Sequence, residues 1–120
     1  MADILVTGEQ VSVQLSLGEK IGALHGDLHF PRSALRMVRV ADRPFAEIAG
    51  LRSPGTRIPG VMALGTWRRS GGPDFVAVYR GGRGVVIDLD AKQASYQRII
   101  LSAKNPGDIR NLLTEPNSGP

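Results

Sequence analysis

Hydrophobic and polar residues alternate most regularly near the start of the chain. In segment 11–17, valine or leucine occupies every second position, with serine and glutamine between, which is the pattern of a half-buried strand. The apolar residues then change to helical spacing, at Leu17, Ile21 and Leu24. Ser16 and Glu19 have the spacing of a capping box, and Gly26 can adopt the left-handed conformation that ends a helix. The pattern predicts a strand followed directly by a short helix.

The middle of the chain is less regular. Segments 27–30 and 35–40 predict two extended pieces, separated by Pro31, whose missing N–H interrupts a strand ladder. Segment 42–51 predicts a turn of helix, with an aspartate at its start and Pro44 close behind it. Segment 52–60 contains two Pro-Gly pairs and is predicted to be a loop.

The second half predicts an antiparallel meander and a closing helix. Four strand-like segments are separated by turn-forming sequences, at 61–69, 74–80, 84–90 and 96–103. The aromatic side chains of the central hairpin are expected to fill one side of it as core, at Trp67, Phe75 and Tyr79. Asn105 and Pro106 predict the start of an amphipathic helix that packs on the sheet.

This order of elements predicts one α+β domain, mostly antiparallel β, over residues 1–114. The length of 120 residues suits a single core. Regular strand–helix–strand alternation along the chain is absent from the predicted order, which excludes a doubly wound sheet. About seven strands and one C-terminal helix predict an open barrel that the helix closes. Residues 115–120 are predicted to form a flexible tail.

Composition narrows the function classes. The chain has no cysteine, so disulfides, thiolate metal sites and cysteine nucleophiles are excluded. The net charge of +4 is compatible with a polyanionic partner. The arginines, however, are scattered along the chain. Aromatic residues make up only 5% of the chain, too few for a surface that stacks on nucleic-acid bases. Nucleic acid is therefore not expected as a partner. Without a signal-like or membrane-spanning segment, the expected location is the cytoplasm.

The candidate chemistry is sparse. His25 and His29 fall on different predicted local structures, so they are not expected to share a metal ion. Asp88 and Asp90 lie at a strand end and are expected to be a solvated pair. No nucleophile elbow, phosphate-binding loop or zinc-protease motif is found in the sequence. The sequence predicts a non-catalytic protein with no cofactor and no metal.

Three stretches, 58–68, 71–89 and 105–113, resemble short actinobacterial proteins of uncharacterised function with a bacterial pleckstrin-homology-like fold. The resemblance covers 11–113 and implies a barrel of that kind. It implies little about activity, because such barrels bind lipids, peptides and proteins through different surfaces. The basic cluster that phosphoinositide-binding members carry on their first two strands is missing, since Lys20 is the only lysine or arginine between Val11 and Phe30.

The leading hypothesis is an adaptor that binds a protein or peptide at an exposed sheet edge or along the long connection. The candidate residues of that connection are Arg43, Phe45, Leu51, Arg52, Arg57 and Ile58. The first alternative is an anionic membrane surface or phosphate group bound through Arg68 and Arg69. The second is a small-ligand carrier or enzyme, which requires a pocket at Asp88 or His29.

Overall fold

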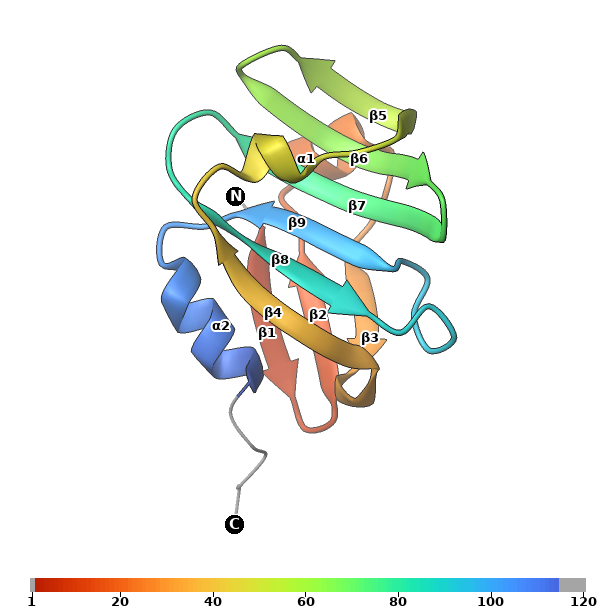
Figure 1. The fold of residues 1–120 in the computed structure, drawn as a ribbon, viewed down its shortest axis with the longest axis vertical. Helices are drawn as coiled ribbons and strands as arrows, with labels where there is room; N and C mark the ends of the chain where they lie inside the picture. Colours follow the sequence, from red (N-terminus) through yellow and green to blue (C-terminus); the bar gives the residue numbers. More distant parts are fainter. Residues whose placement is uncertain (1, 115–120) are drawn as a thin grey trace.

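The computed structural model describes residues 2–114, and the predicted tail at 115–120 lies outside the described residues. The chain forms a small α+β domain, mostly β, with two sheets and two α-helices (Figure 1). The smaller sheet has the order β1-β2-β3, with strands Asp3–Thr7, Gln10–Gln14 and Leu28–Pro31. The larger sheet has the order β4-β8-β9-β7-β6-β5, with strands Leu35–Ala41, Gly84–Leu89, Arg98–Ser102, Gly72–Tyr79, Met62–Arg69 and Leu51–Ile58.

The two sheets lie face to face, with strands that cross at an angle (Figure 1). The main core fills the space between them and contains Val11, Phe30, Phe75, Ile87 and Leu101. A second apolar cluster lies on the other face of the larger sheet, around Trp67, Val76 and Ile100. Phe45 and Ile48, from and just after the 3₁₀ turn η2 (Pro44–Glu47), pack against that cluster. Both faces of the central strands are therefore buried.

The helices begin where the sequence predicts. In α1 (Leu17–Ala23), the Ser16 hydroxyl accepts a hydrogen bond from the Glu19 amide, and the Glu19 carboxylate accepts one from the Ser16 amide, which is the predicted capping box. The helix ends at Leu24, in left-handed conformation, rather than at Gly26. The C-terminal helix α2 (Pro106–Thr114) starts at the predicted proline and packs beside β4 (Figure 1). A further 3₁₀ turn, η1 (Arg32–Ala34), joins β3 to β4.

The predicted meander is wrong in its connectivity. After β7 the chain crosses to β8, which pairs with β4 on one side and β9 on the other. Strand β9 then lies between β8 and β7 and runs parallel to β7, with Asp74 opposite Arg98. The larger sheet is therefore mixed, and strand pairing joins β6 directly to β7 but not β7 to β8.

The closed barrel is not found in residues 2–114, where the two sheets share no strand. Two further expectations are corrected. The predicted loop at 52–60 is mostly strand, because β5 spans Leu51–Ile58. Trp67 lies opposite Asp74 and Phe75 lies opposite Thr66, so the two rings point to opposite faces of the hairpin. Both rings are buried, as expected, but in different apolar clusters.

Candidate functional site

Strand β5 is one of the two edge strands of the larger sheet, at the end opposite β4 (Figure 1). One of its edges pairs with β6, and the other has no strand partner among residues 2–114. Such an edge presents backbone N–H and C=O groups to any extended chain that can pair with them. The segment predicted to be a loop, 52–60, therefore forms most of an edge strand.

The side chains of β5 alternate between the two faces of the sheet. Arg57 lies opposite Ala63 and Arg52 opposite Trp67, so both arginines point to the face that carries η2. Thr56 points to the other face, where its hydroxyl donates to the Gly22 carbonyl of α1 over 2.7 Å. Ile58 points to that face as well. The edge is basic on one face and more apolar on the other.

The exposed side chains of β5 combine apolar surface with unpaired charge. Leu51 is 78% exposed and Ile58 is 47% exposed. Arg52 and Arg57 are also exposed, and neither takes part in an ion pair within the described range 2–114. Four of the six residues predicted for a partner-binding connection therefore lie together on this edge strand.

Pro54 limits the accessible edge. A proline has no N–H to donate to an added strand, and the register with β6 shifts between Arg52 and Gly55. The longest regular stretch of the edge is therefore Gly55 to Ile58.

The predicted arginine pair is divided by the fold. Arg68 is exposed at the end of β6. The Arg69 Nε donates to the Asp74 carboxylate over 2.6 Å, and that carboxylate is fully buried. Arg69 therefore compensates an internal charge, and Arg68 is the member of the pair that faces solvent.

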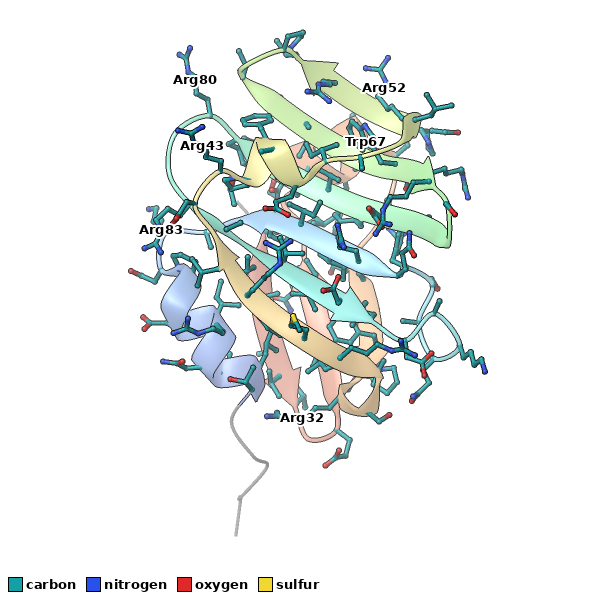
Figure 2. All side chains as sticks on the ribbon, in the orientation of Figure 1. Arg32, Arg43, Arg52, Trp67, Arg80 and Arg83 are labelled. Carbon is teal, nitrogen blue, oxygen red and sulfur yellow. The ribbon has the colours of Figure 1, made fainter. Side chains whose placement is uncertain are left out.

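The other two predicted residues, Arg43 and Phe45, line a hollow of about 340 Å³ between η2 and the loop from β7 to β8. Its other walls are formed by Asp42, Pro44, Ala46, Tyr79, Gly81 and Gly82. Figure 2 shows the side chains of Arg43, Arg80 and Arg83 on this side of the molecule. Arg80 and Arg83 could not be associated with Arg43 from the sequence, because only the fold brings the two segments together.

A smaller cavity of about 240 Å³ opens between the sheets and is lined in part by His25, Asp27, His29 and Tyr96. The His25 ring packs against Phe75 and Tyr96 with centroid distances of 5.6 Å, and its Nδ1 lies 2.7 Å from the Gly26 carbonyl. The His29 Nδ1 lies 2.9 Å from the Ser12 hydroxyl. The cavity has polar groups, but it is smaller than typical ligand pockets of about 300 to 1,000 Å³.

Asp88, in β8, and Asp90, just after it, have separate partners. Asp88 accepts a hydrogen bond from Arg98 over 3.0 Å, whereas Asp90 accepts one from the Lys92 amide over 3.0 Å. Neither carboxylate lines the cavity at His29. In the part of the chain from 2 to 114, no group of three or more His, Asp or Glu side chains is placed to hold a metal ion.

The outer face of α1 is a feature whose exposure the sequence did not reveal. The spacing of Leu17, Ile21 and Leu24 predicts one apolar side of a helix, yet these residues are 65–74% exposed. The helix buries Glu19 and Ala23 on its opposite side. There the Tyr79 hydroxyl donates to the Glu19 carboxylate over 2.7 Å, and burial together with this bond raises the pKa of Tyr79. Gly22 also lies on this buried side, where a Cβ would come within 2.9 Å of the Leu64 side chain, so the missing side chain lets the helix approach β6 closely.

Asp27 gives the junction between β2 and α1 a dependence on pH. The Leu15 amide donates to its carboxylate over 2.7 Å, and the Lys20 ammonium lies 3.7 Å away. These contacts lower the pKa of Asp27 below its usual value. The stabilisation of the folded protein by the Asp27 carboxylate is therefore complete above the pKa of an unfolded aspartate, about 4, and is lost as the pH falls through the lower folded value.

In urea titrations at pH values from about 6 to 2, Asp27→Asn is expected to make the acid-induced loss of stability smaller. An unchanged pH profile would contradict this role.

No helix in the described residues is long and apolar enough to span a membrane. Comparison of the chain with protein-family models, with curated proteins and with solved structures found no match.

Proposed function

We propose that this domain is a non-catalytic binding module that takes an extended segment of a partner protein along the free edge of β5. The observation that carries the proposal is this edge itself, with a regular stretch at Gly55 to Ile58 and exposed apolar and basic side chains beside it. Backbone pairing supplies affinity in such complexes, and the alternating side chains supply specificity. The pleckstrin-homology-like fold stays a hypothesis, and the proposal does not depend on it.

The chemistry of the edge favours a partner strand with acidic and apolar residues at alternate positions. On the η2 face, added side chains would approach Arg52 and Arg57. On the α1 face, they would approach Thr56 and Ile58. Opposite charges and apolar pairs across neighbouring strands are stabilising, by about 0.2–1 kcal/mol for each pair. A second copy of β5 would instead bring arginines against arginines.

Charged residues and proline on an edge strand also prevent aggregation, so the experiment must separate this protective role from recognition. A displayed library of random peptides, selected on the intact protein, is expected to enrich acidic and apolar alternation. The amides of Gly55, Thr56, Arg57 and Ile58 are expected to shift in NMR spectra when an enriched peptide is added. Arg52→Glu combined with Arg57→Glu should weaken its binding about tenfold or more, because two attractive pairs become repulsive.

Arg110→Glu serves as the control, because Arg110 is an exposed arginine on α2 (Pro106–Thr114) and therefore lies outside the proposed binding strand β5. If Arg110→Glu weakened peptide binding equally, the protein's net charge alone would explain the effect of the β5 substitutions. Selection of peptides without the alternating pattern, or NMR shifts confined to other elements, would contradict the proposal.

Binding to vesicles with anionic lipid tests the membrane alternative. Salt-sensitive vesicle binding that requires Arg68, without any peptide enrichment, would favour the membrane alternative.

A further inference from the structure

The hollow between η2 and the loop from β7 to β8 has the features of a small-molecule site. Its volume of about 340 Å³ falls in the usual range for ligand pockets, about 300 to 1,000 Å³. It is separate from the β5 edge proposed above, since none of its lining residues belongs to that strand.

The floor and walls of the hollow are mainly apolar. Pro44 is buried and Phe45 is half-buried, and each offers part of its ring to a ligand. The Tyr79 ring points to the opposite face of the sheet, where its hydroxyl bonds to Glu19. Ala46, Gly81 and Gly82 add little side-chain bulk. Both glycines have positive φ values, 76° and 89°, and a Cβ at either position would meet no atom within 4 Å. A ligand can therefore approach the backbone of this loop closely.

The rim of the hollow is positively charged. Arg43 lines it, and Arg80 and Arg83 flank the two glycines in the chain (Figure 2). The acidic residue that lines the hollow is Asp42, which accepts a hydrogen bond from the Arg83 Nε over 2.9 Å. Arg43 and Arg80 form no ion pair with any described residue between 2 and 114. Asp42 is therefore neutralised by Arg83, whereas Arg43, which lines the hollow, and Arg80, which is next to Gly81 in the chain, keep charges that are unpaired within the described residues.

We propose that this hollow binds a small organic oxyanion, a carboxylate or phosphate group carried on an aromatic or branched apolar body. The guanidinium fork matches both oxyanions, because it can donate two parallel hydrogen bonds to either. The apolar body would lie against Pro44 and Phe45, and the charged group would face Arg43, with Arg80 next to Gly81 as the second candidate cation. An inorganic anion would leave the apolar walls unused, and a neutral aromatic molecule would leave the arginines unused.

The test uses four probes on the intact protein: benzoate, phenyl phosphate, inorganic phosphate and benzyl alcohol. NMR titrations are expected to show saturable shifts at the amides of Phe45, Gly81 and Gly82 with the two aromatic anions. Inorganic phosphate and benzyl alcohol should each bind about tenfold or more weakly than the aromatic anions, since each loses either apolar burial or a charge-assisted bond. The preference between benzoate and phenyl phosphate then identifies the oxyanion.

Arg43→Gln and Arg80→Gln are each expected to weaken binding of the preferred anion about tenfold, and Arg110→Gln should leave it unchanged. Ala46→Glu provides a second measurement at an exposed position, because it places a negative charge on the wall and should also weaken binding. Equal affinity for inorganic phosphate and phenyl phosphate would overturn the apolar part of the proposal. Equal affinity for benzyl alcohol and benzoate, or no effect of Arg43→Gln, would overturn the charged part. These outcomes leave peptide binding at β5 untouched.

Discussion

Replacing Gly65 with alanine is expected to detach β5 from β6 at the middle of the hairpin and to destabilise the protein by about 2–5 kcal/mol. A Cβ at this position would lie 2.4 Å from the Pro54 carbonyl oxygen and 2.6 Å from the Gly55 Cα. Both contacts are with backbone, so no side-chain rotation relieves them. The φ of Gly65 is +136°, which adds backbone strain for any residue with a Cβ.

Urea unfolding measures the loss of stability, and amide hydrogen exchange measures the detachment of β5 from β6. The free energy of unfolding should fall, and the β5 amides that bond to β6 should exchange faster than those of β8. Gly18→Ala is the matched control, because a Cβ there meets no atom within 4 Å and its φ is not in the positive range. In the helix α1 it is expected to be neutral or to stabilise by up to about 1 kcal/mol. A Gly65→Ala protein as stable as the wild type would show that β5 is not held this closely.

Phe75→Ala is expected to cost about 3–5 kcal/mol. The ring is fully buried between the two sheets. It packs against the rings of His25 and Tyr96, each at a centroid distance of 5.6 Å. The truncation would leave a cavity bounded by residues of β7, β9 and the segment after α1, and these elements cannot all collapse into it.

Thermal and urea unfolding measure the loss, with Met37→Ala as the control. Met37 lies on β4 and is 57% exposed, so its truncation should change the stability by no more than about 0.5 kcal/mol. A small effect of Phe75→Ala, comparable to that of the control, would mean that the space between the sheets is less tightly packed than the structure indicates.

Local patterns predicted most elements because each depends on residues close together in the chain. The capping box at Ser16 and Glu19, the proline at the start of α2 and the alternation in β2 act within a few residues. Strand β1 also alternates, with Ile4 and Val6 packed against the core. The sequence does not predict this strand, because it is only five residues long and is followed by polar residues. The prolines and glycines of segment 52–60 predict a loop. One of those glycines, Gly55, is instead needed for close contact with Gly65 across the hairpin.

The arrangement of the elements could not be read from the same patterns. The segment of β9 was recognised, but its place between β7 and β8 depends on contacts between strands far apart in the sequence. The candidate sites follow the same rule. Arg43 and Phe45 could be selected from their own segment, whereas their association with Gly81 and Gly82 arises only from the fold. The sequence also paired Arg68 with Arg69, and could not show that the buried Asp74 binds one of them.

The central position of β9 has a consequence for how the protein is made. Strands β7 and β8 leave the ribosome first, yet in the finished sheet each pairs with β9 along one edge. Until residues 98–102 have been synthesised, those two inner edges have no partner, and their strands carry residues that are fully buried in the finished domain, such as Val76, Val85 and Ile87. The larger sheet is therefore completed only after translation has passed β9, so a nascent chain or fragment that stops earlier exposes aggregation-prone strands at its centre rather than at its arginine-bearing edge.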